Sequence, residues 1–228
     1  WGDEDRCRIG LDEFNGRFYA LVVGIDMQLD NIYRSDDGGM TWNAIIPEWS
    51  IPVNALGGFG WYFSRVRVNP WNQDDISILG VDIWNTTDGG ENWSQMAPAW
   101  WEYSVHADKH DMEWIGPETC ILATDGGLYK TENHGETWED IENIPNSQFY
   151  RVEVNPHYPG RYTGGAQDNG TTSGSYEDLT GWNRDRGGDG FTPIFHPEDP
   201  NFRIATVQYA NFAYSLDTQS EIWYDWTT

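Results

Sequence analysis

Three eleven-residue segments of the chain follow one pattern, and their spacing limits the folds open to it. They are IYRSDDGGMTW (Ile32–Trp42), IWNTTDGGENW (Ile83–Trp93) and LYKTENHGETW (Leu128–Trp138). In each, a Ser or Thr is followed by Asp or Asn two positions later, Gly four positions later and Trp seven positions later. The Ser or Thr positions are 51 and 45 residues apart. A period of this length indicates a chain built from repeated supersecondary units.

A second marker keeps the same phase. The segments RVRVNP, EWIGP, RVEVNP and PIFHP end in prolines that are 47, 39 and 41 residues apart, namely Pro70, Pro117, Pro156 and Pro197. The short alternating runs around both markers predict β-strands. Units of this period that contain only strands are typical of a β-propeller. We therefore predict an all-β propeller of four-stranded blades, with about five blades present.

The chemistry of the repeated segments predicts tight turns between strands. Asp-Gly between alternating runs is a strong hairpin signal, because Gly tolerates positive φ and the Asp carboxylate accepts bonds from nearby backbone N–H groups. The hydroxyl can tie the turn similarly, and the Trp can cover it. We expect a structural role for the residues at these positions: Ser35, Asp37, Gly39, Trp42, Thr86, Asp88, Gly90, Trp93, Thr131, Asn133, Gly135 and Trp138.

These segments resemble the Asp-box, or BNR repeat, and the chain resembles the sialidase and sortilin-like (VPS10-like) propeller superfamily over most of its length. The resemblance implies that each Asp-box joins the third and fourth strands of a blade. We expect a single propeller domain or propeller fragment over residues 1–228, as part of a larger ring that further blades or a partner chain complete. The expected blades are 6–46, 61–98, 102–144, 148–183 and 190–226. The first strand of the first blade is blurred, and the fifth blade is expected to stop soon after its third strand.

The charge of the chain limits its partners. It has 37 acidic residues against 13 Lys and Arg, a formal charge of −24. Such a polyanion repels phosphate backbones and anionic lipid, so nucleic acid and membrane insertion are not expected. The first residues lack the features of a signal peptide, and the repeat favours a mature or trimmed protein that is secreted, on the cell surface or periplasmic. Cys7 and Cys120 permit one disulfide or two inert thiols.

Acidic residues recur at the predicted end of the second strand of four blades. They are Asp26, Asp82, Asp125 and Asp168, and Gln208 has the matching place in the fifth blade. The loops that follow second strands share one end of a propeller with the connections between blades. These carboxylates could bind sugar hydroxyls, a cation or a basic partner at this end, or they could cap their own turns.

The connections between blades supply further candidates. In HADKHD, an extended backbone would place His106, Asp108 and His110 on one face, where they could bind a ligand or a metal. RDRGGDG contains Asp189, which could hold Ca²⁺, although no cofactor is required. The remaining candidate ligand-binding residues are Gln167, Trp61, Trp100 and Trp101, the indoles being suited to stacking on sugars or to packing between blades.

The segments TDGGLYKT, GGAQDNGT and GGDGF resemble "glycosyl hydrolase, BNR repeat" proteins, whose relatives include xyloglucan-cleaving propellers. That resemblance implies acid or base catalysis by Asp125, with Asp168 or Asp82 as its partner. The arginine triad and Tyr/Glu pair of true sialidases cannot be assembled, so a sialidase is disfavoured. The leading hypothesis is an extracellular module that binds a polysaccharide or a protein. A glycoside hydrolase is the alternative, and an assembly scaffold is the third possibility.

Overall fold

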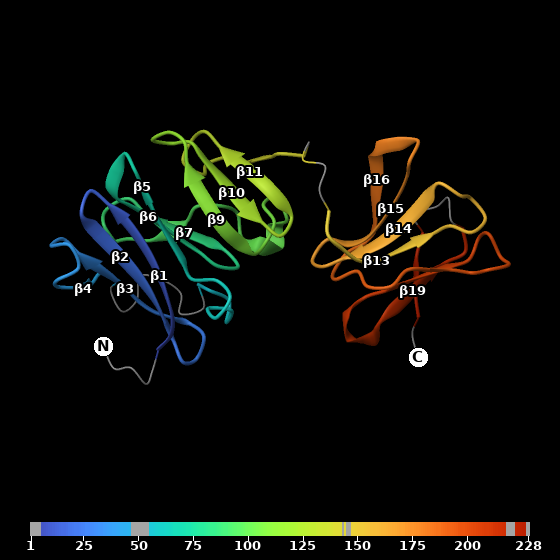
Figure 1. The fold of residues 1–228 in the computed structure, drawn as a ribbon, viewed down its shortest axis with the longest axis horizontal. Helices are drawn as coiled ribbons and strands as arrows, with labels where there is room; N and C mark the ends of the chain where they lie inside the picture. Colours follow the sequence, from blue (N-terminus) through green and yellow to red (C-terminus); the bar gives the residue numbers. More distant parts are fainter. Residues whose placement is uncertain (1–5, 47–54, 143, 145–146, 218–221, 227–228) are drawn as a thin grey trace. The chain divides into compact units, whose positions relative to one another are not determined.

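The protein is built almost entirely of β-strands. The computed structural model describes residues 6–46, 55–142, 144, 147–217 and 222–226, and over these residues it contains five four-stranded antiparallel sheets and no α-helix. Within each sheet the strands lie in chain order, which is the meander of a propeller blade (Figure 1). The predicted fold class, a β-propeller of four-stranded blades, is confirmed. Over the same residues, no helix is long and apolar enough to cross a membrane.

The chain divides into two compact units. The first, Trp1–Ile144, contains three sheets, and the second, Pro145–Thr228, contains two. The sheets of the first unit are β1 (Arg6–Phe14), β2 (Arg17–Gly24), β3 (Leu29–Ser35) and β4 (Asn43–Ala44); β5 (Arg65–Asn69), β6 (Asn72–Leu79), β7 (Ile83–Thr86) and β8 (Ser94–Gln95); and β9 (Lys109–Trp114), β10 (Cys120–Thr124), β11 (Gly127–Thr131) and β12 (Glu139–Asp140). A short 3₁₀ helix, η1 (Trp100–Glu102), precedes β9. The prediction of a single domain stays a prediction.

The second unit contains the fourth and fifth sheets. Their strands are β13 (Phe149–Val154), β14 (Arg161–Ala166), β15 (Gly170–Ser175) and β16 (Asp178–Arg186); and β17 (Ile194–Phe195), β18 (Arg203–Thr206), β19 (Phe212–Ser215) and β20 (Tyr224–Asp225), with η2 (Gln208–Ala210) after β18.

Two details of the blades differ from the sequence-based expectation. The first strand of the first blade is fully formed as β1, and a register shift between Arg6 and Arg8 interrupts its pairing with β2 and so obscures its alternation. The fifth blade does not stop after its third strand, because Tyr224 and Asp225 form β20 against β19. A two-residue strand is too short to show a period in the sequence.

The second strands of the first two blades are buried on both faces. In β2, every residue from Tyr19 to Gly24 is buried, and in β6 the same holds from Asp75 to Leu79. Tyr19, Leu21 and Ile76 belong to one apolar cluster formed by the first and second sheets. A second cluster joins the second and third sheets: Leu79, Ile83, Met96, Ala97, Val105, Met112, Trp114, Cys120, Leu122 and Tyr129. Cys120 is a free thiol whose pKa burial raises to about 12, so it is inert near neutral pH.

The three turn motifs, Ser35–Trp42, Thr86–Trp93 and Thr131–Trp138, share one hydrogen-bond pattern. In the first, Gly39 N donates to Ser35 Oγ (2.9 Å), Thr41 N donates to Asp37 Oδ1 (2.8 Å), and Trp42 Nε1 donates to Gly39 O (3.0 Å). These bonds lower the pKa of Asp37 to about 2, chiefly through the backbone N–H of Thr41. The corresponding bonds recur in the other two motifs, from Gly90 to Thr86, Asn92 to Asp88, Gly135 to Thr131 and Thr137 to Asn133.

The third turn motif also joins two blades. Trp138 Nε1 donates to Met96 O of the preceding blade at 3.1 Å, where the first two Trp residues bond within their own turns. Gly135 lies so close to the same carbonyl that an added Cβ would be 2.2 Å from it. The Asn-Pro markers have a related role, because Asn69 Oδ1 accepts from Trp71 N (3.0 Å) and Asn155 Oδ1 accepts from His157 N (2.9 Å). Each Asn therefore ties the turn between the first two strands of its blade.

Candidate functional site

The acidic residues that follow the second strands do not all have the same role. Asp26 Oδ1 accepts from Gln28 N at 3.1 Å, so this carboxylate caps its own turn. Asp82 Oδ1 accepts from Trp100 N at 2.9 Å, and Asp125 Oδ1 is 2.5 Å from His110 Nε2. The carboxylate of Asp82 thus binds a group from the connection between the second and third blades, and that of Asp125 contacts a side chain of β9. In the loop of Asp125, it is Thr124 Oγ1 that accepts from Gly126 N and holds the turn.

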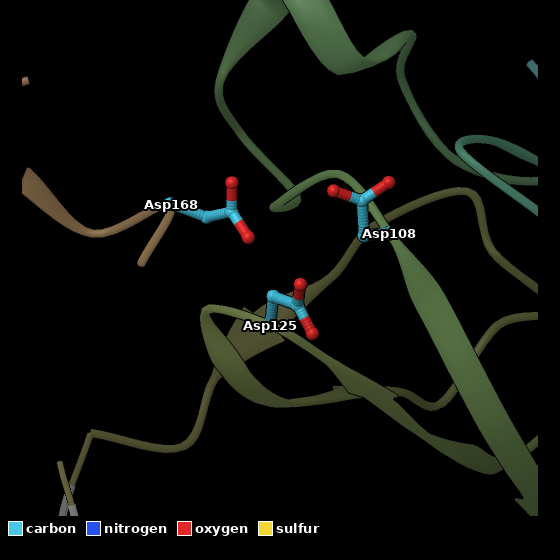
Figure 2. A group of neighbouring side chains, drawn as sticks. All are labelled: Asp108, Asp125 and Asp168. Atoms are coloured by element: carbon cyan, nitrogen blue, oxygen red, sulfur yellow. The ribbon is translucent and has the colours of Figure 1, made fainter. Parts of the chain in front are cut away.

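Asp125 is paired with a second acid, Asp108. Their carboxylate oxygens lie within 4.8 Å of one another, and Asp125 N donates to Asp108 O at 3.3 Å. Figure 2 shows Asp108 in the segment that enters a strand of the third sheet and Asp125 in a neighbouring loop. The short pairing of β9 with β10 brings the two loops together, because Thr124 is the partner of Lys109. Asp168, the third side chain drawn there, belongs to the second unit.

The two acids differ in their surroundings. Burial raises the pKa of Asp108, and the charge of Asp125 raises it further, while His106, Lys109 and His110 act in the opposite direction. Asp125 is next to the imidazole of His110, which lies in β9. Asp108 therefore holds its proton to a higher pH than a carboxyl group in water does. A protonated carboxyl can donate a hydrogen bond as well as accept one.

A buried lysine lies under this site. Lys109 is fully buried, its Nζ donates to Val81 O at 2.7 Å, and it lies 3.7 Å from Asp82 Oδ1. Burial lowers the pKa of Lys109, while the charges of Asp82 and Asp108 act against that effect. Because Lys109 is in β9 of the third sheet and Asp82 is in the loop between β6 and β7 of the second, this pair holds the two blades together beneath Asp108 and Asp125.

The segment HADKHD is not extended throughout. Asp108 has a φ of 62°, so the alternation that would place His106, Asp108 and His110 on one face does not apply. Nδ1 of His106 is 3.0 Å from Ala107 O, and its ring lies against Gly126, where an added Cβ would be 2.4 Å from the ring. His106 therefore packs over the loop of Asp125, while His110 contacts the carboxylate itself. Metal binding by this set stays a prediction.

Aromatic rings border the paired acids. Tyr62 contacts His110 edge to face at a centroid distance of 5.3 Å, and Trp61 packs against Tyr62 at 5.4 Å. Both side chains are at least half exposed, and we call these two residues the aromatic shelf. Trp100 and Trp101 are also exposed, in η1 next to the backbone N–H that binds Asp82. The end of the first unit that carries the acids therefore presents indole and phenol rings to solvent.

The remaining predicted site residues belong to the second unit. Asp168 follows β14, and its N donates to Asp189 Oδ1 at 2.9 Å, while Asp189 N donates to Gln208 Oε1 at 3.1 Å. Gln167 Oε1 accepts from Tyr150 Oη at 2.9 Å. An added Cβ on Gly190 would be 2.1 Å from Gly170 O, so this glycine permits close packing of the fourth and fifth blades. Calcium at Asp189 and the pairing of Asp168 with Asp125 stay predictions.

The sequence reasoning missed three residues of the site. Lys109 was not among the predicted site residues, and neither were Tyr62 and Phe63, although they follow Trp61 directly. Phe63 is buried against His110 at a centroid distance of 5.5 Å. A run of three aromatic residues beside a connection between blades was the signal that could have found the last two.

Comparisons with known proteins give partial likenesses of fold. No family model matches the chain, and no curated protein matches it. A GH74 enzyme from Niastella koreensis is similar to 97% of this chain with 15% identity and a TM-score of 0.43, and the chain spans 38% of its length. YCF48 from Cyanidioschyzon merolae is similar to 98% of the chain, which covers 73% of it, with 16% identity and a TM-score of 0.43. The GH74 xyloglucanase from Xanthomonas campestris has 14% identity over 93% of the chain, 37% of its own length, and a TM-score of 0.41.

Proposed function

We propose that the chain is an Asp-box propeller that works outside the cytoplasm and binds a carbohydrate at the acids and aromatic shelf of its first unit. The observation that carries the proposal is the pairing of Asp108 and Asp125 within 4.8 Å, beside the exposed rings of Trp61 and Tyr62. Flat rings bind the apolar faces of sugars, and neighbouring carboxyl groups bind their hydroxyls.

The charge of the chain narrows the class of carbohydrate. With a net charge of −24, the protein repels polyanions, so acidic polysaccharides are poor ligands for a site made of carboxylates. Neutral glucans and xyloglucan suit this site, since they offer hydroxyls and carry no charge. An extracellular protein with an exposed basic segment is the other class of partner, and it would contact the same carboxylates.

The test is a binding panel measured by titration calorimetry at physiological ionic strength. The panel contains oligosaccharides of β-glucan and xyloglucan, an oligogalacturonate and an oligolysine peptide. We expect a neutral oligosaccharide to bind and the oligogalacturonate not to bind at this site. Tyr62→Ala should weaken the neutral ligand, by roughly 1–3 kcal/mol for one stacked ring. Binding of the peptide alone would overturn the carbohydrate proposal and support a protein partner.

Glycoside hydrolysis is the second candidate, and the same pair favours it. Retaining glycosidases need two carboxyl groups about 5–5.5 Å apart, one of which holds a proton at the working pH. Asp108, whose pKa is raised, would be the acid, and Asp125 would be the nucleophile. Release of reducing ends from the neutral oligosaccharides, lost in Asp125→Asn even at concentrations that saturate this variant, would establish this activity. Retention of an oligosaccharide without any cleavage would contradict it and leave binding as the function.

A further inference from the structure

The second unit contains a cavity beside the turns that follow its strands β13 and β15. It has a volume of about 630 Å³ and is lined by residues of the fourth and fifth sheets. Thr163, Ser173 and Asn183 form one row of its wall, because Thr163 pairs with Ser173 across β14 and β15, and Ser173 pairs with Asn183 across β15 and β16. A cavity of this size is large enough for a small organic ligand.

The corresponding place in the first unit is filled by a buried polar network. Ser77 pairs with Asn85 across β6 and β7, and Asn85 Nδ2 donates to Ser77 Oγ (3.0 Å) and Asp75 Oδ1 (2.7 Å). All three side chains are buried. The Asn-Pro markers align the blades, since Val68 pairs with Ile76 and Val154 pairs with Tyr162.

This alignment shows which residue differences open the cavity of the second unit. Ser77 corresponds to Thr163, Asn85 to the smaller Ser173, and Asp75 to Arg161. Because Ser173 has no amide, the fourth sheet lacks the group that in the second sheet bonds to both Ser77 and Asp75. The cavity that remains at the joint between the second and third sheets has a volume of about 390 Å³. The joint between the fourth and fifth sheets is therefore the roomier of the two.

Two polar side chains that line this cavity, those of Thr163 and Arg161, are available to a ligand. Thr163 is 2% exposed, and within the described residues its Oγ1 has no hydrogen-bond partner. A buried hydroxyl of this kind costs free energy unless something bonds to it. Arg161 has no ion-pair partner among the described acids, although the chain has 37 acidic residues, and its guanidinium lies 5.7 Å from the ring centre of Tyr158. At the base, Arg203 pairs with the buried Asp185 at 3.2 Å.

We infer that this cavity binds a small sugar acid, a hexuronate. Arg161 supplies the cation that a carboxylate requires, and guanidinium–carboxylate bonds are among the strong ones. Thr163 and Ser173 supply hydroxyls for the hydroxyl groups of the sugar. The exposed rings of Tyr158 and Tyr176, which also line the cavity, supply flat apolar surface for the sugar ring. This inference is independent of the proposed function, because every residue it uses is in the second unit.

The test measures binding of D-glucuronate, D-glucose and acetate to the full chain by titration calorimetry. We expect D-glucuronate to bind more tightly than either of the others, since only it offers both a carboxylate and a ring of hydroxyls. Arg161→Gln removes the charge at the rim and should weaken D-glucuronate by roughly 10- to 100-fold, the range for a hydrogen bond to a charged group. Arg151→Gln is the matched control, because Arg151 is exposed on β13 and does not line the cavity, and it should leave affinity unchanged.

A second variant tests the location without relying on charge. Ser173→Asn restores the side chain that the second sheet has at this place, where it should fill the cavity and bond to Thr163. We expect it to abolish D-glucuronate binding while it keeps or raises the melting temperature. Absence of D-glucuronate binding to the unmodified chain would overturn the inference, as would equal binding of D-glucose or unchanged affinity in both variants.

Discussion

His134 Nε2 donates to Oδ2 of Asp75 at 2.8 Å, and this bond joins the third blade to a buried carboxylate of the second. The bond is the main cause that raises the pKa of His134, with burial acting against it. A His whose pKa is raised in the folded state contributes stability that is fully present below its unfolded pKa of about 6.5. That contribution is lost as the pH rises through the folded value. We predict that His134→Gln removes a fall in melting temperature between about pH 6 and pH 8.

The control for this prediction is His157→Gln. Nε2 of His157 is 2.9 Å from a backbone carbonyl, that of His196, and so it has no carboxylate partner in that contact. This variant should keep the pH dependence of the unmodified chain. If His134→Gln showed the same slope of melting temperature against pH as the unmodified chain, the bond to Asp75 would not contribute to stability.

Gly135 fits between two blades, and Gly38 offers a matched comparison. Both have positive φ, 85° and 73°, but only Gly135 has a neighbour that a Cβ would strike, Met96 O at 2.2 Å. Gly38→Ala should cost about 1–2 kcal/mol in the free energy of unfolding, from backbone strain alone. Gly135→Ala should cost a further 1–3 kcal/mol or so, because the blades must move apart. Equal losses in denaturant unfolding would show that the contact with Met96 is unimportant.

Lys109 stabilises the joint between the second and third blades through Asp82 and Val81 O. Lys109→Met keeps most of the apolar stem but leaves Asp82, which is mostly buried, without its cation. Removing one member of a buried pair costs about 3–5 kcal/mol, so denaturant unfolding should show a loss near this range. Lys130→Met is the control, since Lys130 pairs with the exposed Glu132 and its loss should leave stability nearly unchanged. A similar small loss for both would contradict the structural role of Lys109.

The repeat allowed the fold to be predicted, because each blade needs its own turn and its own buried second strand. Turn chemistry at Asp37 and Asp88 is local in the chain, so the residue pattern alone locates the third and fourth strands. The fourth strands themselves are two residues long in four blades, and only their pairing with the third strand defines them. The fourth strand of the fifth blade, β20, could therefore not be predicted from strand periodicity.

The candidate site was harder to predict than the fold. Asp125 was found because its loop matches a motif, whereas its pairing with Asp108 depends on how β9 and β10 meet. The left-handed conformation of Asp108 also breaks the extended geometry that the spacing of HADKHD suggests. The same limit applies to Ser173 and Arg161, whose meaning is visible only once the blades are aligned strand by strand.

The most direct test of the central claim compares Asp125→Asn with Asp26→Asn in their affinity for the neutral oligosaccharide that binds best. Both acids follow a second strand, but Asp26 caps its own turn, whereas Asp125 faces Asp108 and His110. Calorimetric titration should show a loss of roughly tenfold or more for Asp125→Asn, as expected for a hydrogen bond to a charged group, and no loss for Asp26→Asn. Equal affinities in both variants and in the unmodified chain would contradict a binding site at Asp125.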